Sequence, residues 1–162
     1  MFLRALFSAL TLALGAVCAN AAPADKPVFD PALAEKTGAD EHGMRAYVLV
    51  VLKTGPTKVA AGPERDEMFK GHFANIKRLG DAGKLAVAGP FMAPKGVSGV
   101  PSDGWRGLFI FAVPTVEEAQ VLVATDPVIQ KGEMVAEFHP LYSSAALMLV
   151  NEGHGKVAKQ SF

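Results

Sequence analysis

The pattern of apolar and polar positions predicts four strands and two helices between residues 45 and 144. One helix is indicated by apolar residues that recur at spacings of four and three and so share one face: Phe69, Phe73, Ile76 and Leu79. Pro63 favours the first turn of this helix, and Gly83 favours the left-handed cap that ends it. Runs rich in β-branched and apolar residues predict the strands, at residues 45–53, 85–91, 105–113 and 133–142.

The second helix is marked by a capping box, T-x-x-E, formed by Thr115 and Glu118. Asp126 and Pro127 follow this helix, and they favour either a separate helical turn with Asp126 as its N-cap or a tight loop. The resulting order, β-α-β-β-α-β, is that of the ferredoxin-like plan. The sequence therefore predicts an α+β fold with an antiparallel four-stranded sheet and both helices on one face.

The first predicted strand is apolar on both of its faces. Its alternating positions are Val48, Val50 and Leu52 on one side and Tyr47, Leu49 and Val51 on the other. A sheet with helices on one face only would leave such a second apolar face exposed to water. The simplest cover is another copy of the same chain, so we expect a homodimer.

The first 22 residues have the layout of a secretory signal peptide. A basic start at Arg4 precedes an apolar run over residues 5–17 and the small-residue end Ala19-Asn20-Ala21. The apolar run is shorter than the ~20 residues that a membrane-spanning helix needs. We therefore expect cleavage, a periplasmic or secreted mature protein, and no membrane anchor after cleavage. Cys18, the only cysteine, would leave with the signal, so the mature chain would contain no disulfide.

The rest of the chain divides into three segments. Residues 23–44 show no period and are expected to form an irregular extension, 45–144 the folded domain, and 145–162 a C-terminal extension. The apolar stretch AALMLV in the last segment fits either a strand or a helix packed on a neighbour. Acidic and basic residues balance at 16 each without charge runs, which argues against a nucleic-acid partner.

His72 lies on the apolar stripe of the first helix, where an imidazole needs an explanation. A core histidine with one satisfied hydrogen bond is the simple interpretation. Two features favour chemistry: Gly71 leaves space beside it, and Asp126 offers a carboxylate that can cap a helix and still accept a proton from the ring. Such a carboxylate fixes the imidazole tautomer and leaves the other nitrogen to act as a general base or acid.

Four further residues are expected to bind substrate around this pair: His139, Gly89, Pro90 and Trp105. Each also has a simpler role, at a strand end for His139, in a turn for Gly89 and Pro90, and as a strand-entry anchor for Trp105. No metal site is expected, because H-x-H and H-x-x-x-H spacings are lacking. His42 and His154 fall in segments where they are expected to be solvated.

The stretches GHFANIKRLGDAGKLAVAGPF and WRGLFIFAVPTVEEAQVLVATDPVIQKGEMVAEFHPLY resemble the YCII-related family of small proteins. The resemblance covers residues 47–142 and rests on the helical histidine, the AGP that ends the second strand, the EEA helix start and the DP…G turn. It implies a dimeric α/β barrel and a histidine–aspartate pair in a pocket, roles that fall on His72 and Asp126. It implies no single reaction: some relatives resemble enzymes that dehalogenate or isomerise small ring compounds.

Two functions remain open from the sequence. The first is a cofactor-free enzyme in which His72 is the general acid or base, Asp126 orients it, and the reaction is an elimination, isomerisation or hydrolysis of a small organic molecule. The second is a dimer that only binds a small molecule. A haem protein is a third and weaker alternative, since dimeric α/β barrels also host haem on a histidine ligand.

Overall fold

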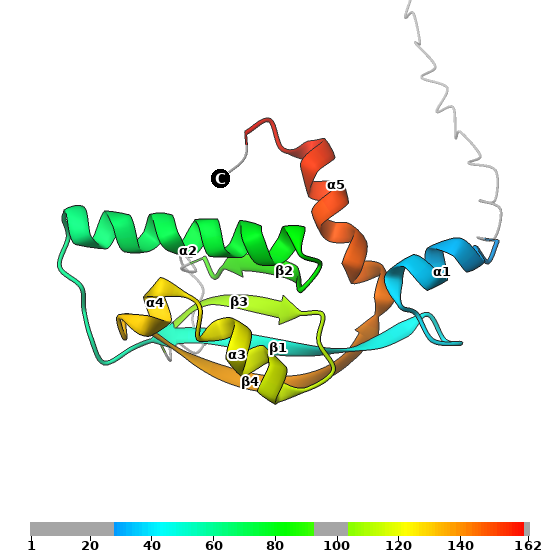
Figure 1. Ribbon diagram of the computed structural model, residues 1–162, viewed down its shortest axis with the longest axis horizontal. Coiled ribbons are helices and arrows are strands. Elements are labelled where there is room, and N and C mark those ends of the chain that lie inside the picture. Colours follow the sequence, from blue (N-terminus) through cyan, green and yellow to red (C-terminus); the bar gives the residue numbers. More distant parts are fainter. Residues whose placement is uncertain (1–27, 93–103, 161–162) are drawn as a thin grey trace, which may run out of the picture.

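The computed structural model describes residues 28–92 and 104–160, and it forms a four-stranded antiparallel sheet with helices packed on one face (Figure 1). The strands are β1 (Met44–Thr54), β2 (Leu85–Pro90), β3 (Trp105–Phe111) and β4 (Met134–Ser144), and the sheet order is β2-β3-β1-β4. Helix α2 (Pro63–Asp81) connects β1 to β2, and α3 (Val116–Val123) with the short α4 (Pro127–Gln130) connects β3 to β4. The ferredoxin-like α+β fold predicted from the sequence is thus confirmed.

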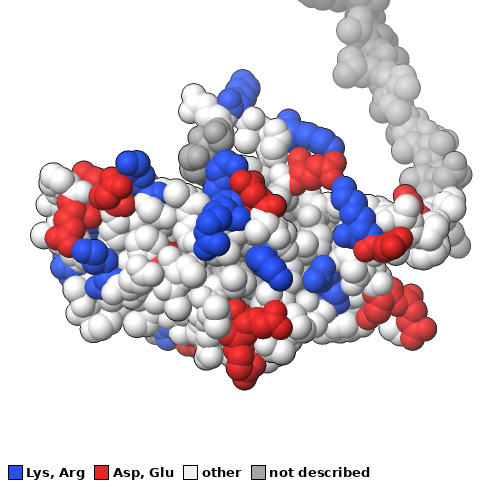
Figure 2. Space-filling model, viewed as in Figure 1, with Lys and Arg blue, Asp and Glu red and all other residues white. Residues whose placement is uncertain are grey.

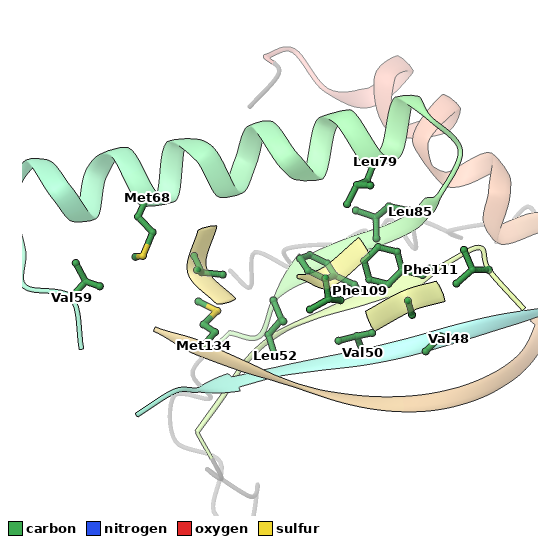
Figure 3. Close-up of a cluster of buried hydrophobic side chains, with 14 residues drawn as sticks. Val48, Val50, Leu52, Val59, Met68, Leu79, Leu85, Phe109, Phe111 and Met134 are labelled. Carbon is green, nitrogen blue, oxygen red and sulfur yellow. The ribbon is translucent and has the colours of Figure 1, made fainter. Parts of the chain in front are cut away.

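The main core fills the space between the helices and the sheet (Figure 3). Phe109 and Phe111 of β3 lie at its centre, and Val50 of β1 packs beside them. Helix α2 contributes Met68 and Leu79 to the same cluster. Because side chains alternate along a strand, these positions place every second residue of each strand on the helix side and the others on the opposite face.

The C-terminal extension covers one end of that opposite face. A second, smaller cluster joins Tyr47, Ala86 and Ala112 to Leu147 and Met148 of the 3₁₀ helix η1 (Ala145–Leu149). The chain then continues as helix α5 (Val150–Val157). The AALMLV stretch is therefore helical and packs on its own protomer.

The rest of the sheet face opposite the helices, beyond the part that η1 covers, lies on the central strands β1 and β3. Leu49 and Leu108 are half-buried there and lie outside the smaller cluster. The second apolar surface expected from the strand pattern is therefore present, although the chain's own tail covers part of it.

The segment before β1 is more ordered than the sequence suggested. Residues 23–44 were expected to be irregular, but α1 (Pro31–Thr37) forms within them, with the Asp30 carboxylate accepting from the Leu33 N–H at 3.0 Å. Gly38, at φ 67°, ends the helix. The Asp-Pro pair that starts α1 is the same signal that starts α4, so the sequence held the information for both helices.

The extensions on both sides of the domain meet at one end of the sheet, where α1 and α5 lie near each other (Figure 1). Lys36 of α1 and Glu152 of α5 form an ion pair at 3.1 Å. The predicted signal peptide, residues 1–22, lies outside the described residues. Among the described helices, none combines the length and apolarity needed to cross a membrane.

Charges of both signs are interspersed over the face shown in Figure 2. Many of them are paired, as in the contacts Lys131–Glu64 at 2.6 Å and Lys77–Asp81 at 2.7 Å. No large patch of one sign is visible on this face.

The contact between α1 and α5 gives a first prediction. Hydrogen bonds from Lys156 and then Lys36 lower the pKa of Glu152 from 4.5 to about 2. Because folding lowers this pKa, its stabilising contribution is present above pH 4.5 and is lost as the pH falls toward 2. We expect Lys36→Met to raise the pKa of Glu152 without restoring 4.5, because Lys156 remains.

The measurement is the side-chain carboxyl ¹³C shift of Glu152 in an NMR pH titration. Lys77→Met, whose lysine pairs with Asp81, is the matched control and should leave the Glu152 titration unchanged. A Glu152 pKa near the usual 4.5 in the unmodified protein would contradict the contact between the two extensions.

Candidate functional site

The candidate site begins on the buried face of α2. Met68, His72, Asn75 and Leu79 are the buried residues of this helix, at spacings of three and four. His72 is 7% exposed and Asn75 8% exposed. The buried face thus carries two polar side chains at its middle, one helical turn apart, whereas Phe73, which the predicted apolar stripe included, is 46% exposed.

Asp126 meets His72 from the link between α3 and α4. Its two carboxylate oxygens lie 2.9 and 2.8 Å from His72 Nδ1, and its side chain is completely buried. The same carboxylate accepts from the Val128 N–H at 3.1 Å, so it also caps α4 as the sequence predicted. An ionised carboxylate only accepts hydrogen bonds, so the Nδ1 position of His72 carries the proton. The other ring nitrogen, Nε2, is left for a second partner.

Gly71 explains how the two segments come this close. A Cβ atom at this position would lie 2.9 Å from Cγ of Pro127, the residue after Asp126. The space that the sequence predicted beside His72 is therefore occupied by α4, which packs against α2 there. Glycine costs roughly 1 kcal/mol in a helix interior, and here it allows the contact that carries Asp126 to the imidazole.

Aromatic rings surround the imidazole. The centroids of Phe69 and Phe109 lie 6.0 Å from its centroid, and that of Phe73 lies 5.4 Å from it. Phe73 is itself 46% exposed, and Ala88, the β2 neighbour of Phe109, is also exposed. The ring is therefore deeply placed, and solvent lies just beyond the phenyl group of Phe73.

A second polar contact between the same two segments was not foreseen. Asn75 Oδ1 lies 2.6 Å from an Arg78 guanidinium nitrogen and 3.1 Å from the Thr125 hydroxyl oxygen, and Arg78 also donates to that hydroxyl at 3.0 Å. We call Asn75, Arg78 and Thr125 the Asn75 cluster. Two signals were available in the sequence: Asn75 follows His72 by three residues on an otherwise apolar stripe, and Thr125 precedes Asp126.

The structure does not bring His139 to the pair within one protomer. His139 lies opposite Leu49 in the sheet, on the face away from the helices, and its Nε2 lies 2.8 Å from a Glu137 oxygen. Lys53 is 3.4 Å from the other oxygen of Glu137. Lys53, Glu137 and His139 thus form a row of polar contacts beside the half-buried apolar surface of the sheet.

Gly89, Pro90 and Trp105 lie at the β2–β3 end of the sheet. Trp105 is 46% exposed and its ring stacks near Phe91, with centroids 5.3 Å apart. Gly89 and Pro90 pair with β3, where Gly107 lets the strands approach closely. Within the described part of the chain, none of the three predicted residues forms a hydrogen bond or ring contact with the histidine–aspartate pair.

Two cavities occur elsewhere among the described residues. The larger, about 360 Å³, lies between α3, α4 and β4 and has an apolar lining that includes Val123, Ile129 and Phe138. The smaller, about 230 Å³, lies between α1 and η1. Neither is lined by His72 or Asp126. Over the same residues, no group of three or more His, Cys, Asp or Glu side chains is placed to hold a metal ion.

Comparison with known families decides the classification. The model of the YCII-related domain matches residues 46–138, more than half of the chain. The chain belongs to the YCII-related family. The match contains both members of the histidine–aspartate pair and the Asn75 cluster, whereas α1, η1 and α5 lie outside it.

Comparisons with individual proteins give less information about this YCII-related chain than the family match does. No curated protein sequence matches it significantly. A solved structure that does match is 5-chloro-2-hydroxyhydroquinone dehydrochlorinase from Burkholderia phenoliruptrix AC1100, in complex with 2,5-dihydroxybenzoquinone. The two are 20% identical with a TM-score of 0.39, and the match covers 60% of this chain and 90% of that one. At this identity and TM-score, the likeness carries no argument about the function of this chain.

The packing of Gly71 against Pro127 gives a second prediction. Alanine in place of a helical glycine normally adds about 0.5–1 kcal/mol of stability. At Gly71 the new methyl group would meet Pro127 at 2.9 Å, so α4 must move. We expect Gly71→Ala to lower the free energy of unfolding and to shift the NMR signals of the His72 ring.

Gly80→Ala is the matched control on the same helix. The nearest atom to its added Cβ is 3.5 Å away, an ordinary contact, so this variant should be more stable than the wild type. Urea unfolding of both variants measures the difference. Equal stabilisation by the two substitutions would show that α4 does not press on Gly71.

Proposed function

We propose that this YCII-related protein is an exported, homodimeric enzyme that uses His72 and Asp126 for cofactor-free acid–base chemistry on a small organic molecule. The observation that carries the proposal is the placement of His72 Nδ1 between both oxygens of a buried carboxylate, at 2.8 and 2.9 Å. A buried carboxylate is costly to maintain without such a partner. The pair is also contained in the part of the chain that matches the family.

The chemistry that such a pair performs is proton transfer. Asp126 holds the Nδ1 proton, which fixes the tautomer and directs Nε2 toward the reacting molecule. Nε2 takes a proton from a C–H bond or from water, and the imidazolium that forms is stabilised by Asp126. The same proton then passes to the leaving group or to another atom of the molecule. Elimination, isomerisation and hydrolysis all balance in this way without an electron acceptor.

Export is proposed from residues 1–22, whose layout is that of a signal peptide. The homodimer is proposed from the sheet face opposite the helices. Leu49 and Leu108 are half-buried on that face, and a second sheet packed there would form an α/β barrel.

A binding protein without turnover is the second candidate. The observation that favours it is the low exposure of the His72 side chain, at 9%, since a deeply placed imidazole can serve recognition alone. The two candidates differ in one measurable respect, namely whether a bound molecule is converted.

Substitution of the pair tests both candidates. A panel of small aromatic and carbonyl compounds is screened by thermal shift on the mature protein, and compounds that bind are followed by NMR for conversion. We expect His72→Ala to reduce turnover by about 10²- to 10⁴-fold, the range typical of general acid–base catalysis. Asp126→Asn should also reduce turnover while keeping an oxygen that can cap α4.

His42→Ala is the matched control, because His42 is exposed in the α1–β1 turn and should not affect conversion. A compound that binds without being converted, and whose thermal shift disappears in both site variants, would support the binding protein. Full turnover in His72→Ala would refute the proposal that His72 is the general acid or base of an enzyme.

The proposed dimer is tested separately. Leu108→Glu would place a charge in the contact between the two sheets, so we expect the mass measured by light scattering to fall from dimer to monomer with an unchanged circular dichroism spectrum. Val121→Glu, at a residue of α3 that is 68% exposed, is the control and should remain dimeric. A monomeric wild-type protein at micromolar concentration would contradict the proposal.

A further inference from the structure

The amide group of Asn75 is held in one orientation. A guanidinium group can only donate hydrogen bonds, so the atom of Asn75 that faces Arg78 at 2.6 Å has to be the oxygen. The Thr125 hydroxyl lies on the same oxygen at 3.1 Å. Rotation of the amide by half a turn would place its NH₂ against the guanidinium, a donor facing a donor, so the Arg78 contact fixes the orientation. The Thr125 hydroxyl can donate or accept, and it also lies 2.7 Å from the Leu122 carbonyl oxygen, so its contact is compatible with this orientation but does not decide it.

This orientation leaves the amide nitrogen of Asn75 without a hydrogen bond to any described residue, although the side chain is only 8% exposed. Over the described part of the chain, Arg45 Nε is the one side-chain polar atom that is both fully enclosed and unpaired. The Asn75 nitrogen therefore keeps contact with solvent. The donor is thus held in place by its cluster and still reachable from solvent, so it is available to an acceptor atom of a ligand.

The free donor lies beside the histidine–aspartate pair. Asn75 is three residues from His72 on the same face of α2, a spacing that places Cβ atoms about 5–6 Å apart. Its anchor, Thr125, directly precedes Asp126, so both polar contacts join the same two segments. A ligand atom bound by the Asn75 N–H groups would lie within the length of one small molecule from His72 Nε2.

Arg78 strengthens this donor through the amide. Its positive charge lies on the oxygen side of Asn75, and a hydrogen bond to the oxygen polarises the N–H groups on the other side. Donors of this kind, fixed before the reaction, stabilise the negative charge that develops on an oxygen when a proton is removed nearby.

We propose that Asn75 binds the oxygen of the substrate, and that the substrate class is a small molecule carrying a carbonyl, carboxylate or phenolic oxygen close to the atom that His72 deprotonates. Arg78 and Thr125 are positioning residues that fix the amide. This inference rests on the proposed function for the proton transfer, while the oxygen contact itself is testable without turnover.

The first test observes the Asn75 side chain directly. Benzoate and acetophenone, which carry an acceptor oxygen, are titrated into ¹⁵N-labelled protein, with toluene as the matched compound that lacks one. We expect the Asn75 side-chain NH₂ signals to move with benzoate and acetophenone and to stay in place with toluene. The inference would be overturned if none of the three compounds changed the chemical shifts of the Asn75 NH₂ group, or if toluene changed them as much as benzoate and acetophenone do.

The second test removes the donor while keeping the cluster. Asn75→Asp retains an oxygen for Arg78 and Thr125 but has no N–H group, so a merely structural role predicts a melting temperature and an affinity for the uncharged acetophenone at or above those of the wild type. Loss of a hydrogen bond to its carbonyl oxygen predicts acetophenone binding weaker by about fivefold or more. Unchanged acetophenone affinity in Asn75→Asp would overturn the inference.

The two proposals fail in different ways. Suppose that His72→Ala retains turnover while benzoate still shifts the Asn75 side-chain NMR signals. The acid–base proposal is then refuted, and the proposed contact between Asn75 and the ligand oxygen is supported. If His72→Ala loses turnover while Asn75→Asp converts substrate with the wild-type KM and kcat, the oxygen contact falls alone.

Discussion

The hydrogen bond between His72 and Asp126 holds together the two halves of the helical layer. It joins α2 to the link between α3 and α4, and both of its partners are withdrawn from water. A carboxylate buried to this degree needs partners for its charge, and Asp126 obtains them from the imidazole and from the backbone of Val128. The contact of Gly71 with Pro127 sets how closely the segments approach. The position of the candidate chemistry is therefore fixed by the packing of the fold.

Much of the fold could be predicted from the sequence because its signals are local. The apolar periodicity of α2, the capping box at Thr115 and the Asp-Pro start of α4 each act within a few residues, and the structure shows each of them. The same local Asp-Pro signal was present at Asp30, yet α1 was missed because only seven residues follow it and they show no clear stripe. The tail after Ser144 was ambiguous because a short apolar run fits a strand or a helix equally well, and only contact with Tyr47 and its neighbours decides.

The site was less predictable than the fold because it depends on contacts between distant segments. The pairing of His72 with Asp126 could be predicted from the sequence. His72 is a polar residue on an apolar helix face, Asp126 is a carboxylate at a predicted helix start, and the family resemblance linked the two. The Asn75 cluster was not foreseen, because an asparagine and a threonine are common in helices and their meeting across 50 residues leaves no mark on the sequence. His139 lies on the opposite face because strand parity decides its side, and its expected place at the pocket ignored that alternation.

The C-terminal tail has a consequence for symmetry. Leu147 and Met148 occupy the Tyr47 end of the open sheet face, so that end is not free for another molecule. In the proposed dimer, a two-fold axis through this face would pass nearer Leu108, and the two sheets would overlap over only part of their length. A chain cut after Ser144 would lack this obstruction, so the tail limits the offset at which the two sheets of the proposed dimer can pair.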